Sequence, residues 1–174
     1  MRKALYFLGI LNDSDIDWLV AAGNRREVGA GATLIEEGRP IESLYLVIDG
    51  AFSVHTVAMG GREVARLMSG EVVGEMSFVD QAPPSATVQA LEASFVLDIP
   101  RRRLNAKLAE EAGFAARFYR ALSMFLAARL RTTNAALAGD RAGGSEDEMD
   151  FDSLDNVSMA GARFDWIQRR LRSA

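Results

Sequence analysis

Two short segments set the expected architecture: Val72-Val73-Gly74-Glu75-Met76-Ser77-Phe78 and, after a polar spacer, Ser85-Ala86-Thr87-Val88. The two valines indicate the end of a strand, and the residues after Gly74 indicate one turn of helix. The first amides of a helix have no partner inside it, and the helix dipole makes them attractive to an anion. The alternation from Ser85 to Val88 predicts a strand whose amides return to the same place. Together the segments predict a phosphate pocket.

The carboxylate of Glu75 follows the glycine directly and would repel a phosphate that it faced. We therefore expect Glu75 to accept a hydrogen bond from a neutral hydroxyl group, such as a ribose 2′-OH. The predicted ligand-binding residues of the two segments are Gly74, Glu75, Met76, Ser77, Ser85, Ala86 and Thr87.

Short β runs separated by glycine-containing turns fill most of the chain from residue 26 to 100. Residues 52–57 alternate, and after Gly60-Gly61 residues 63–67 alternate back, which predicts a hairpin. Two short helices are expected before this region, over residues 4–11 and 13–22. The expected fold is α+β and mainly β: an antiparallel jelly-roll β roll with N-terminal helices, a long C-terminal helix and a tail helix.

The two segments resemble the phosphate-binding cassette of the cyclic nucleotide-binding domain family. The family pattern is hydrophobic-Gly-Glu-x-small-hydrophobic, a spacer, and then Arg-small-Ala-x-hydrophobic. It is matched in place by Gly74, Glu75, Ser77, Ser85, Ala86 and Val88. A second family signature is similar to residues 34–50, where Leu34-Ile35 precedes Gly38 and residues 44–47 precede Gly50. The resemblance implies a β roll like that of catabolite activator protein, in a stand-alone member without a DNA-binding domain.

Pro84 departs from the family pattern, because it stands where the family's arginine neutralises the cyclic phosphate. Losing one partner of such a buried charged pair costs about 2–5 kcal/mol, and proline has no N–H that could replace the donor. Arg66 and the run 101–103 stay open as other sources of charge, although we interpret that run as a solvated face. The resemblance implies weakened or altered binding of cyclic AMP or cyclic GMP and no other cofactor.

A long helix is predicted from Phe114 to Leu137, after a shorter helix over residues 101–111 that ends at Gly113. Its apolar stripe consists of Phe114, Phe118, Leu122 and Phe125, followed by Arg129. The stripe suits packing on the chain's own β roll or pairing with a second subunit, and we favour a homodimer through residues 114–137. In the family this helix covers the pocket, and the resemblance aligns Thr133 and Asn134 with residues that touch the purine. The alternative is that residues 132–134 are an exposed polar turn late in the helix.

The composition changes at residue 139, which predicts three parts. Residues 1–138 form the cyclic nucleotide-binding-like domain with its long helix, and residues 139–155, rich in Gly, Asp and Glu, form a flexible acidic linker. Residues 156–174 form an amphipathic basic tail helix, with an apolar face of Ala160, Phe164, Ile167 and Leu171. This helix could dock on the roll, bind a partner or touch an anionic surface, and we favour docking or a protein partner.

The composition argues against several functions. The 174 residues include no cysteine and one histidine, so the chain lacks a thiol nucleophile and a His/Cys metal set, and we predict no catalytic residue, no metal site and no enzyme. His55 is expected to face solvent or be satisfied locally. A net charge of −4 and the acidic linker argue against direct DNA binding. The absence of a spanning apolar run and of a secretory signal predicts a cytoplasmic protein.

Two functions stay open on the sequence. The first is a non-enzymatic regulatory module that binds a cyclic nucleotide or a related ligand and transmits occupancy through the long helix to a protein partner. The second is a ligand-free protein–protein interaction and dimerisation module that keeps the β roll and the long helix.

Overall fold

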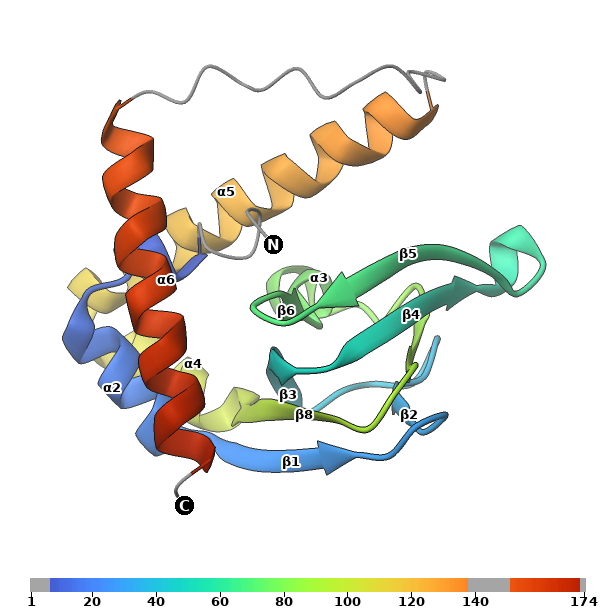
Figure 1. Cartoon of the computed structure of the whole chain (residues 1–174), viewed down its shortest axis with the longest axis horizontal. Coiled ribbons are helices and arrows are strands. Elements are labelled where there is room, and N and C mark those ends of the chain that lie inside the picture. The colour runs from blue at the N-terminus through green and yellow to red at the C-terminus, as the bar shows by residue number, and fades with distance from the viewer. Residues whose placement is uncertain (1–6, 138–150, 173–174) are drawn as a thin grey trace.

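The computed structural model describes residues 7–137 and 151–172 (Figure 1). Residues 7–10 are helical and lead into α2 (Asp13–Ala22). The strands that follow are β1 (Asn24–Val28), β2 (Thr33–Ile35), β3 (Ser43–Asp49), β4 (Ala51–Thr56), β5 (Arg62–Met68), β6 (Val72–Val73), β7 (Thr87–Ala90) and β8 (Ser94–Pro100). The remaining helices are the 3-10 turn η1 (Val57–Met59), α3 (Glu75–Asp80), α4 (Arg101–Glu110), α5 (Ala112–Leu137) and α6 (Phe151–Arg172).

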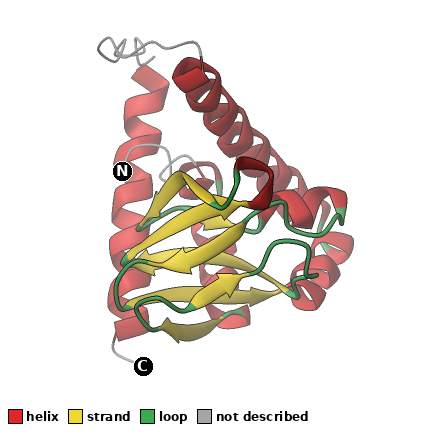
Figure 2. Cartoon of the chain, turned by 90° about the vertical axis from the view of Figure 1, so that its right-hand side faces the viewer, coloured by secondary structure: helices red, strands yellow, loops and turns green. Residues whose placement is uncertain are grey.

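The strands form two four-stranded antiparallel sheets in the orders β1-β8-β3-β6 and β2-β7-β4-β5. β4 and β5 pair as the expected hairpin, with Phe52 opposite Leu67. The helices α2, α4, α5 and α6 gather on one side of the strands, as Figures 1 and 2 show from two directions. The expected α+β jelly roll with flanking helices is confirmed.

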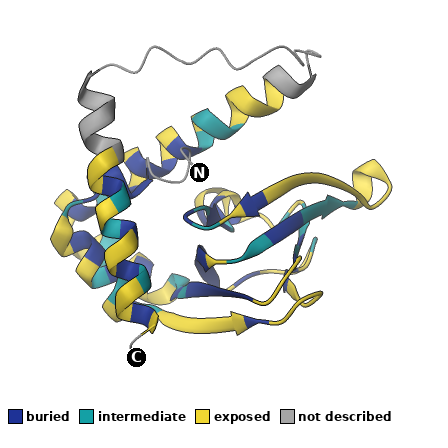
Figure 3. Cartoon of the chain, in the orientation of Figure 1, coloured by how far each residue is buried: buried dark blue, intermediate teal, exposed yellow. Residues whose placement is uncertain are grey.

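β3 is buried on both faces and so divides two hydrophobic cores (Figure 3). Tyr45 and Val47 point into the roll, where they join Phe52 of the opposite sheet. The alternate residues Leu44, Leu46 and Ile48 belong to the second core, which the helices share. Burial on both faces explains why this strand is a continuous apolar run and does not alternate.

The apolar stripe of α5 packs on the chain's own domain. Phe114, Phe118, Leu122 and Phe125 are all buried in the second core, and Phe118 makes edge contacts with the rings of Phe7 and Phe78. Of the two interpretations of this stripe, packing on the β-roll domain is therefore the observed one. A homodimer through residues 114–137 would have to use another face of the helix.

The tail helix α6 docks on the same core, as expected. Ala160, Phe164, Ile167 and Leu171 are buried there. Gln168 donates to the carbonyl of Ile48 at 2.7 Å. Ile48 lies at a break in the β3–β8 register between Val47 and Asp49, and such irregularities leave a residue outside the regular ladder. The register break thus coincides with the Ile48 carbonyl that Gln168 contacts.

The structure differs from the sequence prediction at two helix boundaries and in one additional strand. α6 begins at Phe151 and not at Asn156, because acidic residues favour the first turn of a helix; the rest of the predicted linker lies in residues 138–150, outside the described residues. The break between α4 and α5 falls at Glu111, which is extended, and Gly113 lies inside α5. β1 was not expected, because its first four residues are exposed and polar.

Candidate functional site

Gly74 forms the turn between β6 and α3 that the sequence placed at the centre of the site. It adopts a left-handed conformation with φ of 87°, which other residues adopt only with strain. A Cβ atom here would also lie 2.7 Å from Cδ1 of Ile41. The positive φ therefore favours glycine here, and α3 starts without a side-chain cap.

Glu75 is held by α5. Its side chain is almost completely buried, and Oε1 accepts a hydrogen bond from Nη1 of Arg129. Nη2 of Arg129 lies 3.8 Å from Glu71, and the guanidinium stacks over the ring of Phe125 at 4.9 Å. α5 therefore crosses the cassette at Arg129. The sequence carries no local sign of this ion pair, although a buried carboxylate needs a cation or hydrogen-bond donors close by.

The second segment lies beside the first through Ile35. Ile35 pairs with Val88 in the β2–β7 ladder, and its Cδ1 lies 3.6 Å from where a Cβ on Gly74 would be. The turn at Glu37 and Gly38 is hydrogen-bonded to β7 and to the segment just before it. The amide of Gly38 donates to the carbonyl of Pro84 at 2.8 Å, and the amide of Glu37 donates to the hydroxyl of Thr87 at 3.1 Å.

The side chains of the predicted cassette residues differ in exposure. Glu75 and Ser77 are buried, Ala86 and Thr87 are half-buried, and Met76 and Ser85 are exposed. The carboxylate of Glu75 is thus recessed, and Ser85 is the exposed small side chain of the two segments. Contact of any of these residues with a ligand stays a prediction.

Thr133 and Asn134 lie beyond the cassette on α5, and both are exposed. Thr133 is four residues after Arg129, so it shares a helix face with the arginine that reaches Glu75. Its hydroxyl donates to the carbonyl of Arg129 at 3.1 Å and can still accept. A contact between these two residues and a purine stays a prediction.

The other charged candidates have local partners. Arg66 pairs with Glu63 at 2.6 Å on β5, and His55 has Nε2 2.8 Å from the hydroxyl of Ser53, as expected for a locally satisfied histidine. The run 101–103 is not simply a solvated face. Arg101 donates to two backbone carbonyls, and Arg103 donates to the carbonyl of Ala22 at 3.1 Å.

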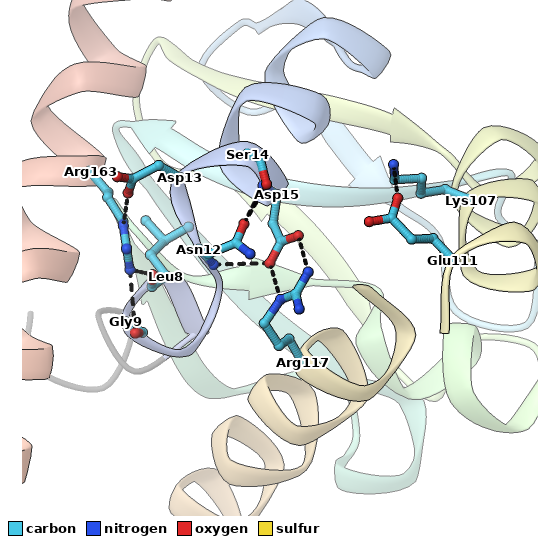
Figure 4. A network of polar contacts seen from close by, with 10 residues as sticks. All are labelled: Leu8, Gly9, Asn12, Asp13, Ser14, Asp15, Lys107, Glu111, Arg117 and Arg163. Carbon is cyan, nitrogen blue, oxygen red and sulfur yellow. Dashed lines mark hydrogen bonds and ion pairs between the residues drawn. The ribbon is translucent and has the colours of Figure 1, made fainter. Parts of the chain in front are cut away.

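A second polar network joins the start of α2 to α5 and α6 (Figure 4). Asp15 belongs to the capping box of α2 with Asn12, and its carboxylate accepts two hydrogen bonds from Arg117 at 2.6 and 2.8 Å. Arg163 of α6 donates to Asp13 and to the carbonyl of Leu8. Burial of the Asp15 carboxyl raises its pKa, but the hydrogen bonds and the charge of Arg117 outweigh burial and lower the pKa below its usual value.

Within the described ranges, no group of three His, Cys, Asp or Glu residues could hold a metal ion. The helices there also include none that is long and apolar enough to cross a bilayer.

Comparison with known proteins identifies the family of the domain. The family model of the cyclic nucleotide-binding domain matches residues 25–111, which is half of the chain. The chain is 35% identical over 98 residues to an uncharacterised NTE family protein of Mycobacterium tuberculosis, covering 55% of this chain and 16% of that protein. It is 31% identical over 103 residues to the cyclic AMP receptor protein of Thermus thermophilus, covering 58% and 47%. The chain therefore spans less than half the length of these relatives.

The fold has a close structural counterpart. A crystal structure of a cyclic nucleotide-binding domain from Methylobacillus flagellatus superposes with a TM-score of 0.72 at 21% identity, covering 82% of this chain and 85% of that one. The family match includes the glycine turn at Gly74 and the buried Glu75 that follows it. This chain belongs to the cyclic nucleotide-binding domain family.

Proposed function

We propose that the chain is a non-enzymatic regulatory domain whose cassette binds cyclic AMP or cyclic GMP weakly. The observation that carries the proposal is the pair between Glu75 and Arg129, because it joins the predicted ribose-binding carboxylate to the helix that would transmit occupancy. Arg129 contacts Oε1 of Glu75, and a carboxylate can accept several hydrogen bonds. The carboxylate thus keeps capacity for a ligand hydroxyl.

Weak binding follows from Pro84. At this position the family pattern has an arginine, and its loss removes about 2–5 kcal/mol, or at least about tenfold in affinity. Arg66 pairs with Glu63 on β5, so we do not assign the missing charge to it. The amides at the start of α3 and the hydroxyl of Ser85 are the remaining donors for the phosphate.

Calorimetry tests the proposal directly. We expect weak heats of binding when cyclic AMP or cyclic GMP is titrated into the wild-type protein. Pro84→Arg should tighten binding by at least about tenfold, because it restores the cation at the cassette. Pro83→Arg is the matched control, since it adds the same charge one residue away and should leave the affinity near the wild-type value. No binding to either the wild type or Pro84→Arg would reject the function.

A second candidate function is a ligand-free dimerisation module acting with a protein partner in the cytoplasm. It is favoured by two exposed apolar side chains of α5, Tyr119 and Leu130, which the domain's own core does not cover. They are eleven residues apart and so lie on the same face of the helix. We propose this face as the homodimer surface. Light scattering of wild type and Leu130→Glu over a range of concentrations tests it. A monomeric wild-type protein at every concentration would reject the dimer.

A further inference from the structure

Arg101, the first residue of α4, contacts the cassette from a different helix than Arg129 does. Its Nη1 donates to the carbonyl of Ile41 at 3.0 Å, and its Nη2 donates to the carbonyl of Ser77 at 2.5 Å. Its backbone amide donates to the carbonyl of Glu42 at 2.8 Å. The guanidinium also lies over the ring of Phe78, 5.6 Å from its centroid. One side chain thus contacts two separate segments of backbone.

Both of these backbone segments, at Ile41 and at Ser77, border the turn at Gly74. Ser77 belongs to α3, and its carbonyl also receives the amide of Gln81, which ends the helix. A cation at the carbonyl end of a helix is favourable for its dipole. Ile41 borders the turn itself, because its Cδ1 lies against Gly74. Arg101 therefore fixes the distance between α3 and the segment that packs on Gly74.

We propose that Arg101 is a positioning residue for the cassette: it holds the Gly74 turn and α3 in the geometry that Glu75 needs to bind a ligand, without itself touching the ligand. The inference rests on the proposed function for its effect on affinity. Arginine suits this role because its planar guanidinium donates from two nitrogens in a fixed geometry, whereas lysine offers one flexible point charge.

The affinity test compares Arg101→Gln with Arg102→Gln. Arg102 is the next residue of α4 and is exposed, so both variants lose one positive charge from the same helix. We expect Arg101→Gln to weaken cyclic AMP binding about tenfold in the Pro84→Arg background, as for a lost charged hydrogen bond, and Arg102→Gln to leave it unchanged. Arg101→Lys should fall between the two. Equal affinities of Arg101→Gln and Arg102→Gln would overturn the proposal.

Hydrogen exchange in the ligand-free protein separates this inference from the proposed function. Arg101→Gln should speed exchange of the amides of residues 75–81 about tenfold relative to Arg102→Gln, while the melting temperatures of the two variants stay alike. If cyclic AMP binds neither the wild type nor Pro84→Arg, the proposed function fails, and exchange alone decides whether Arg101 holds the turn. Exchange that is the same in both variants, or a general loss of stability in Arg101→Gln alone, would reject a positioning role.

Discussion

α5 carries two arginines that each contact a buried carboxylate, and the two contacts differ in how completely the carboxylate is used. Arg117 donates two hydrogen bonds to Asp15, which also accepts the amide of Asn12 at 2.9 Å. Arg129 contacts one oxygen of Glu75, at a helix that has no side-chain cap. We call the first contact, in which Arg117 uses both oxygens of Asp15, the closed pair, and the second, in which Arg129 uses one oxygen of Glu75, the open pair. Under the proposed function, the closed pair stabilises the fold and the second oxygen of the open pair accepts a ligand hydroxyl.

The largest effect expected is on stability, at the closed pair. Asp15→Ala removes a carboxylate that is 2% exposed and leaves its capping and arginine donors unpaired. We expect the free energy of unfolding to fall by about 1.5–3 kcal/mol, because hydrogen bonds to a charged group are lost while Arg117, with 33% of its side chain exposed, stays hydrated. Urea denaturation measures the loss. Asp17→Ala is the control on the same helix, where the side chain is exposed, and should cost less than about 0.5 kcal/mol. Similar losses in the two variants would contradict a structural role for Asp15.

The next effect is on affinity, at the open pair. Glu75→Ala in the Pro84→Arg background should weaken cyclic AMP binding by at least about tenfold, because a hydrogen bond to a charged group contributes about 1.5–3 kcal/mol. Calorimetry measures it. Glu71→Ala is the control, since Glu71 lies farther from Arg129, at 3.8 Å, and should change the affinity much less. If both variants lose affinity equally, Glu75 does not contact the ligand.

A smaller effect concerns the pH dependence of stability. Because the pKa of Asp15 is lowered in the folded protein, its ionised form stabilises the fold above the ordinary pKa of about 3.9. This contribution is lost as pH falls through the lowered pKa, with a slope of at most about 1.4 kcal/mol per pH unit. Urea denaturation of wild type and Asp15→Asn over this acid range measures the slope. A steeper acid loss in Asp15→Asn than in wild type would show that the sign is wrong.

The smallest effect is expected past the open pair, at the predicted purine contact. Thr133→Ala should weaken cyclic AMP binding by about 0.5–1 kcal/mol, up to roughly fivefold, in the Pro84→Arg background. Thr132→Ala is the neighbouring control, because its hydroxyl makes the same kind of bond to its own helix, to the carbonyl of Ala128 at 3.0 Å. Fluorescence competition with cyclic AMP distinguishes them. An equal response of the two variants would remove Thr133 from the site.

Local patterns in the sequence determined most of the elements. The hairpin of β4 and β5, the glycine turn at Gly74 and the apolar face of α6 were all predicted, because alternation, helical spacing and turn glycines act within a few residues. β1 was not predicted, because it is a strand through its pairing with β8 and has little apolar pattern of its own. The cassette motif was matched as a sequence, so the main-chain turn at Gly74 could be expected.

Only the tertiary structure decided which side chains meet. Arg129 and Glu75 are 54 residues apart in the sequence, and Arg117 and Asp15 are 102 apart. Arg101 appeared to belong to a solvated run, yet it holds two carbonyls beside the cassette. No local pattern specifies such partners, because long charged side chains suit many exposed positions and their contacts depend on how the helices pack. The sequence by itself therefore determined the roll and its glycine turn, and packing of α4 and α5 against the roll decided which charges surround that turn.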